Sequence, residues 1–180
     1  MKSILMAILA SFSITAWAAD FAKTYQLGGQ NLELCAHTPM KKMLFNLGDV
    51  ALYAENCAVV KADSLTSQPI NLTFKYERNF DGEDFIRSSD ELIKRNTDAT
   101  EYQTIKADLA AFNASYQAIA DGEHYDIGWS EASGLILSKN DRQLSQADSA
   151  SLAAIYFRIW FGNEPFSQNI KEALLSGENR

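Results

Sequence analysis

Residues 70–85 read INLTFKYERNFDGEDF, and the spacing of their apolar side chains changes part-way along. In the first half, apolar residues alternate with polar ones, at Ile70, Leu72, Phe74 and Tyr76. This alternation predicts a half-buried strand with one face in solvent. In the second half, Asp81-Gly82-Glu83-Asp84 combines a helix N-cap with acidic first-turn residues. A strand and a helix therefore follow one another directly, which indicates a mixed fold class.

Two more strands are expected before this segment. Leu32, Leu34 and Ala36 alternate with polar neighbours, as in a strand with one buried face. Residues 43–53 carry apolar side chains at odd and even positions, which is typical of a central strand covered on both faces. Pro39-Met40-Lys41-Lys42 is the predicted turn between the two strands.

Two helices are expected after residue 81. The first carries one face of Phe85, Ser89, Leu92 and Asn96 and frays by Thr97. The second has apolar residues at alternating spacings of three and four, namely Tyr102, Ile105, Leu109, Phe112, Tyr116 and Ile119. Such a stripe predicts a helix packed on a sheet, ending at Asp121-Gly122.

The remaining chain repeats this order. Strands are expected at Tyr125–Trp129, Leu135–Leu137 and Gln143–Ala147, with a tight hairpin turn at Asn140-Asp141. A helix capped by Asp148 or Ser149 then runs to Gly162, and a last one runs from Ser167 to Gly177. Strands, two helices, strands and two helices predict one α+β domain with a mainly antiparallel sheet.

The first nineteen residues have the pattern of a cleaved signal peptide. Lys2 precedes an apolar run from Ile4 to Ile14, and Ala16-Trp17-Ala18 supplies the small residues that signal peptidase requires, with cleavage near Ala18 or Ala19. The run is shorter than the roughly 20 residues of a transmembrane helix. We therefore expect a periplasmic or secreted domain over residues 20–180 with no transmembrane segment. The alternative is an N-terminal core helix.

Composition excludes several classes of protein. The 180 residues are 47% hydrophobic and 22% charged, which is ordinary for a globular chain. The formal net charge is −7, and an acidic chain without a basic run is not expected to bind nucleic acid. No glycine-rich loop follows a strand, and we expect no cofactor.

Metal and disulfide chemistry have few candidate residues. Of the two histidines, His124 lies in the polar run Glu123-His124-Tyr125-Asp126, where a metal site would need ligands from elsewhere, so no metal site is predicted. An oxidising compartment favours a disulfide between Cys35 and Cys57. A turn near Met40 would hold them far apart, so the pairing stays open.

Two residues near the C-terminus are candidates for ligand binding. Arg158 is a charge within an apolar turn, where it either faces a ligand carboxylate or extends to solvent from a helix end. Trp160 either lines an aromatic pocket or belongs to the core.

Two stretches together resemble the chalcone isomerase-like family, in its small secreted bacterial branch. Residues 34–53, LCAHTPMKKMLFNLGDVALY, are similar to the family's opening hairpin, and residues 158–177, RIWFGNEPFSQNIKEALLSG, are similar to its Arg-x-Trp-x-Gly, Pro and Leu-Leu-x-Gly ending. The resemblance covers about residues 21–177. It implies an open-faced β-sandwich, in which helices lie on one face of an antiparallel sheet and a cleft separates the two layers.

The resemblance also implies which positions would carry chemistry. In the family an Arg on the opening hairpin and a hydroxyl residue on the next strand serve both flavanone-ring closure and fatty-acid binding. Here these positions hold Met40 and Gly48, which cannot stabilise an oxyanion or hold a carboxylate. Lys42 shares the face of Met40 in an extended strand and could replace the lost charge.

Three functions remain as alternatives. The first is a non-catalytic protein that binds a small apolar or amphipathic ligand in the sheet–helix cleft. The second is a structural or protein-interaction domain with a collapsed cleft. The third, which the replaced Arg and hydroxyl positions disfavour most, is an isomerase or intramolecular lyase. The sequence favours the first and identifies no protein partner.

Overall fold

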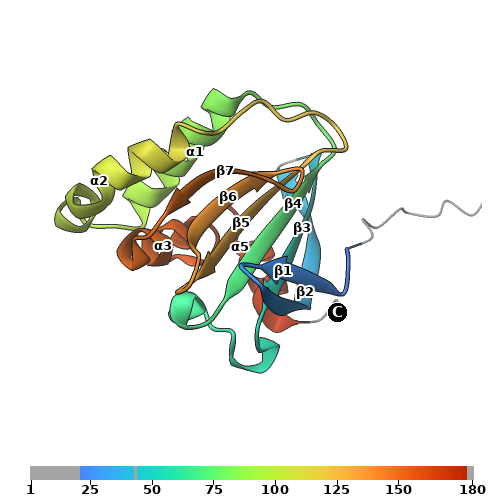
Figure 1. Ribbon diagram of the computed structural model, residues 1–180. Coiled ribbons are helices and arrows are strands. Elements are labelled where there is room, and N and C mark those ends of the chain that lie inside the picture. Colours follow the sequence, from blue (N-terminus) through green and yellow to red (C-terminus); the bar gives the residue numbers. More distant parts are fainter. Residues whose placement is uncertain (1–20, 43, 178–180) are drawn as a thin grey trace, which may run out of the picture.

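The computed structural model describes residues 21–42 and 44–177, and within them the chain forms a curled seven-stranded sheet (Figure 1). Every strand pairs antiparallel with its neighbour in the sequence, in the order β1 to β7. The strands are β1 (Thr24–Leu27), β2 (Gln30–Lys42), β3 (Phe45–Ala54), β4 (Ile70–Tyr76), β5 (His124–Ser130), β6 (Gly134–Lys139) and β7 (Arg142–Ala147). The predicted signal peptide, residues 1–19, lies outside the described residues.

Helices pack against one face of this sheet. They are α1 (Gly82–Arg95), α2 (Ala99–Asn113), α3 (Ala150–Tyr156), α4 (Arg158–Phe161) and α5 (Gln168–Ser176). Short 3-10 turns η1 (Cys57–Val59) and η2 (Leu65–Ser67) lie between β3 and β4. The main core joins sheet residues such as Leu72 and Ile127 to helix residues such as Leu109 and Leu152. The predicted α+β class and the layer of helices on one face are confirmed.

The opposite face of the sheet carries a second, smaller core. It consists of Phe21, Leu27, Leu32, Ala51 and Tyr53. This cluster shows that the predicted solvent face of β4 is wrong, because Asn71 and Thr73 are buried on that face. The curled sheet brings β1 over the middle strands, where a Cβ on Gly128 would lie 2.7 Å from a methyl group of Leu27.

The predicted turn at Pro39 is also wrong, because β2 continues through Lys42. In the described part of the chain, β1 pairs with β2 only as far as Glu33. At Pro39 the side of β2 that faces β1 nearer the start of the strand is therefore an unpaired sheet edge. Proline has no N–H, and at this edge its absence removes no hydrogen bond between strands. On the other side, Pro39 pairs with Asp49.

The second helix is shorter than its apolar stripe predicts. It ends at Asn113, and Tyr116 and Ile119 lie in the connection to β5. The Asn113 amide donates to Ser89 Oγ at 2.8 Å, and Ile119 forms a β-bridge with Phe80. The predicted helix ending at Gly162 is interrupted at Phe157, which separates α3 from α4. No helix in the described ranges is long and apolar enough to cross a membrane.

Candidate functional site

A cavity of about 360 Å³ separates the sheet from the helices. Its sheet wall carries side chains from alternate positions of two strands, Phe74 and Tyr76 of β4 and Tyr125 and Ile127 of β5. Alternate residues of a strand share a face, so the predicted period of two places all four on the helix side. The helix wall carries Phe85, Ser88, Ser89 and Leu92 of α1 with Ile159 and Trp160 of α4. This volume lies within the usual range for small-molecule sites.

Two of the three phenol groups in the cavity wall, those of Tyr116 and Tyr125, are hydrogen-bonded to the protein. Tyr125 Oη donates to the Gln117 carbonyl at 2.6 Å. Tyr116 Oη lies 2.9 Å from Tyr156 Oη, which in turn donates to Asn113. Burial raises the pKa of the Tyr116 and Tyr125 phenols, so both stay neutral near pH 7. A ligand in the cavity would therefore contact mainly the faces of aromatic rings and methyl groups of the wall.

The mouth of the cavity is polar. Lys42 and Asp84 line it, and Lys42 Nζ lies 5.5 Å from the centre of the Phe166 ring. An open groove of about 620 Å³ shares Lys42 and Phe80 with the cavity and continues over the surface. An amphipathic ligand could therefore place an apolar chain inside and a charged head group at this edge.

The two positions identified by resemblance lie opposite one another. Met40 of β2 pairs with Gly48 of β3, and Met40 lines the cavity. Gly48 has φ +133, and a Cβ there would lie 1.9 Å from the Lys75 carbonyl oxygen. Lys42 and Trp160 also line the cavity, so the structure brings Met40, Lys42 and Trp160 together around it.

A family model described as chalcone isomerase-like matches residues 15–176. The chain belongs to the chalcone isomerase-like family. Among solved structures it is similar to a fatty-acid binding protein of Arabidopsis thaliana, with 15% sequence identity and a TM-score of 0.52 over 84% of this chain and 95% of that chain. No curated protein matches the chain.

Arg158 of this chalcone isomerase-like chain, for which a position facing a ligand and one extending to solvent were both left open, does not line the cavity. Its Nη1 donates to the Asn96 carbonyl at 3.1 Å and to the Glu101 carboxylate at 2.7 Å. Asn96 is the C-cap of α1 and Glu101 lies in the first turn of α2, so this side chain lies at the junction of the two helices. The guanidinium therefore joins α4 to that junction.

The structure settles the open disulfide prediction. Cys35 and Cys57 are bonded, with Cα atoms 5.2 Å apart. The argument against pairing assumed a turn near Met40, whereas β2 ends at Lys42 and β3 ends at Ala54. A register shift between Leu34 and Ala36 and the return of the chain at η1 bring the two residues together.

Several cavity residues of the chalcone isomerase-like chain were not singled out by sequence reasoning. Tyr76, Phe80, Phe85 and Tyr116 form ring contacts with centroids 5.4 to 6.0 Å apart. Phe85 could have been identified from the sequence, because it is the first residue on the apolar face of the predicted first helix. Phe80 could not, because it lies in the connection between a strand and a helix.

Proposed function

We propose that this chain is a secreted or periplasmic, non-catalytic member of its family that binds a fatty-acid-like ligand. The observation that carries the proposal is the apolar cavity between sheet and helices, with Lys42 at its mouth. The acyl chain would occupy the cavity and the carboxylate would lie at Lys42. The fold shared with a fatty-acid binding protein supports this choice of ligand.

The energetics favour an acyl chain. Each methylene that leaves water contributes about 0.8 kcal/mol, so burial alone can hold a long chain. Met40 and Gly48 provide no side-chain hydrogen bond for a developing oxyanion, which argues against isomerase or lyase chemistry. The cavity also argues against the alternative of an interaction domain, since that function predicts a collapsed cleft. The disulfide supports an oxidising compartment.

Ser88→Trp is expected to weaken palmitate binding about tenfold or more. Ser88 is exposed on α1 yet lines the cavity, so an indole at this position would fill the mouth with little effect on the core. A tenfold loss corresponds to about 1.4 kcal/mol of binding free energy. Binding is measured by isothermal titration calorimetry with delipidated protein.

Glu91→Trp provides the matched control, because Glu91 is exposed on the same helix and does not line the cavity. It should bind palmitate as the unchanged protein does. Equal affinities for all three proteins would contradict binding in this cavity. Absence of palmitate binding by the unchanged protein would contradict the proposed function itself.

Lys42→Gln is expected to weaken palmitate binding about threefold to tenfold and to leave hexadecanol binding within about twofold. A partly exposed ion pair between Lys42 and the palmitate carboxylate contributes only modestly to the binding free energy. Hexadecanol has no carboxylate, so it cannot form this ion pair and loses nothing when Lys42 is replaced. Lys41→Gln is the control, because Lys41 is an exposed neighbour outside the cavity lining. If Lys42→Gln weakened palmitate and hexadecanol binding to a similar extent, the palmitate carboxylate would not lie at Lys42.

A further inference from the structure

Three potential metal ligands converge on the sheet face opposite the cavity. His124 Nε2 lies 3.5 Å from Asp126 Oδ2 and 3.4 Å from Asp141 Oδ1. The three ligand atoms all lie within 4.8 Å of one another. His124 and Asp126 alternate with the cavity residues Tyr125 and Ile127 along β5, so they point to the other side of the sheet.

Asp126 is the unusual member of this cluster. Its side chain is 2% exposed, and Oδ1 accepts hydrogen bonds from Thr73 Oγ1 at 2.6 Å and from Asn71 Nδ2 at 3.4 Å. Its Oδ2 accepts no hydrogen bond from any residue in the described ranges. A buried carboxylate oxygen without a donor is costly, and native structures rarely contain one. Thr73 and Asn71 thus fix the carboxylate while Oδ2 faces His124.

The β6–β7 turn holds Asp141 beside His124. Asn140 and Asp141 both have positive φ values, +48 and +63, as in the tight hairpin turn predicted from the sequence. The His124 backbone N–H donates to Asn140 Oδ1, and the Asn140 N–H donates to the His124 carbonyl. Asp141 is therefore the ligand from elsewhere in the chain that the polar run at residues 123–126 lacked.

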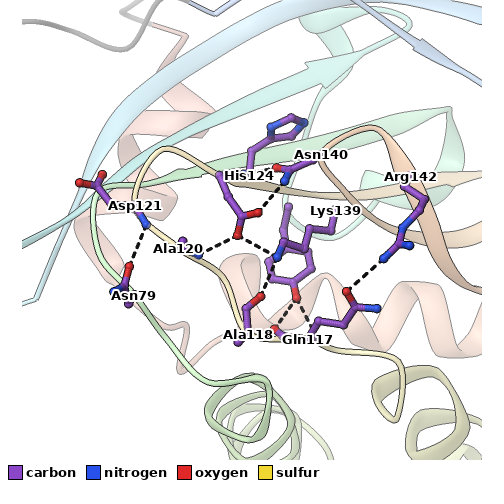
Figure 2. A network of polar contacts seen from close by, with 11 residues as sticks. Asn79, Gln117, Ala118, Ala120, Asp121, His124, Lys139, Asn140 and Arg142 are labelled. Carbon is purple, nitrogen blue, oxygen red and sulfur yellow. Dashed lines mark hydrogen bonds and ion pairs between the residues drawn. The ribbon is translucent and has the colours of Figure 1, made fainter.

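A second polar network anchors the β6–β7 turn to the start of β5, on the side away from the His124 ring (Figure 2). The Asn140 amide donates to Glu123 at 2.8 Å, and Lys139 Nζ lies 2.7 Å from the same carboxylate. Figure 2 shows the His124 ring pointing away from this network. The anchoring fixes the turn before any ion binds, which is what a preorganised site requires.

We propose that His124, Asp126 and Asp141 bind a divalent transition-metal ion of the zinc class, with water as the fourth ligand. Nitrogen and carboxylate ligands of zinc lie about 2.0–2.1 Å from the ion, so two ligands at a tetrahedral angle lie about 3.4 Å apart. The distances from His124 to the two carboxylates match this separation. The ion would also give Asp126 Oδ2 a partner.

The site has access to solvent on one side. The Asp141 side chain is 88% exposed and His124 is 25% exposed, whereas Asp126 is closed in beneath them. An ion can therefore enter past Asp141, which can also rotate to complete the coordination. Because the site and the cavity lie on opposite faces of the sheet, metal binding does not depend on the proposed fatty-acid function.

The test uses untagged, metal-stripped protein and zinc chloride. Calorimetry should give one zinc ion per chain, and saturating zinc should raise the thermal midpoint by about 5 °C or more. Asp141→Asn should weaken zinc binding about tenfold or more with an unchanged midpoint in the absence of zinc, because Asp141 is exposed. His124→Asn should have a similar effect on affinity.

Asp63→Asn and His37→Asn are the matched controls. Asp63 is an aspartate between η1 and η2, away from the cluster, and His37 is the other histidine of the chain. Both variants should bind zinc as the unchanged protein does. The proposal is overturned if the unchanged protein does not bind zinc at 1:1 stoichiometry, or if Asp141→Asn and Asp63→Asn bind it equally.

Discussion

Gly48→Ala is expected to destabilise the protein by about 4 kcal/mol. The positive φ of +133 disfavours any side chain, and the new Cβ would lie 1.9 Å from the Lys75 carbonyl oxygen. The backbone strain costs roughly 1–3 kcal/mol, and the displacement of packed atoms costs about 1–3 kcal/mol more. The cost of displacing packed atoms cannot easily be reduced by a local shift, because the obstructing atoms belong to the backbone of β4. Urea unfolding measures the loss as a lower midpoint at an unchanged slope.

Gly29→Ala separates the two contributions. Gly29 also has a positive φ, +85, but a Cβ added there would meet no heavy atom within 4 Å beyond its chain neighbours. Only conformational strain applies there, so the expected cost is roughly 1 kcal/mol. If both variants lose the same stability, close contact with β4 is not what requires glycine at position 48.

The same contact bears on the chemistry of the site. The resemblance aligns Gly48 with the hydroxyl residue of the family, yet even a methyl group is excluded there. Gly48→Thr, alone or with Met40→Arg, would therefore disrupt the β3–β4 pairing before it could supply a hydroxyl. The local backbone of this chain is adapted to a residue without a side chain, which agrees with the non-catalytic role proposed above.

Features set by neighbouring residues could be predicted from the sequence. Asp81 and Asp84 form the capping box of α1, Asn140-Asp141 forms the hairpin turn, and Ser167 caps α5. Each depends on hydrogen bonds or backbone angles within a few residues. From β2 onward the order of strands and helices followed from these signals and from the change in period near residue 80, whereas β1 was not predicted and α3 and α4 were expected as one helix.

Features set by tertiary partners could not be predicted in this way. The stripe through Tyr116 and Ile119 has helical spacing, but Asn113 bonds to Ser89 and the helix ends there. Arg158 lies beside cavity residues in the sequence, and its ion pair with Glu101 directs it elsewhere. Spacing alone carries no information on partners far apart in the chain.

The candidate site shows the same division. Met40 was identified through the family resemblance and Lys42 because strand alternation places it on the face of Met40, and both line the cavity. Asp141 could not be added to His124 and Asp126 from the sequence, since the sheet register that joins β5 to the β6–β7 turn is a long-range property. A predicted hairpin gives the position of the β6–β7 turn in the sequence. Only the pairing register of β5 with β6 shows that His124 lies beside that turn.

Removing the Cys35–Cys57 disulfide is expected to cost about 3 kcal/mol. The bond closes a loop with a sequence separation of 22, and the chain-entropy model gives about this value for a loop of that length. It ties η1, in the long connection between β3 and β4, to the register shift in β2. A Cys35→Ala/Cys57→Ala double variant should therefore unfold at a lower urea concentration than the oxidised protein.

Reduction of the unchanged protein is the companion experiment. A thiol reductant should lower its stability by nearly the same amount and should not affect the double variant, since that variant has no disulfide to lose. Palmitate affinity should stay within about twofold in both cases, because neither cysteine lines the cavity. A loss below about 1 kcal/mol would mean that the unfolded chain gains little freedom when the loop opens, and that β3–β4 pairing already confines this connection.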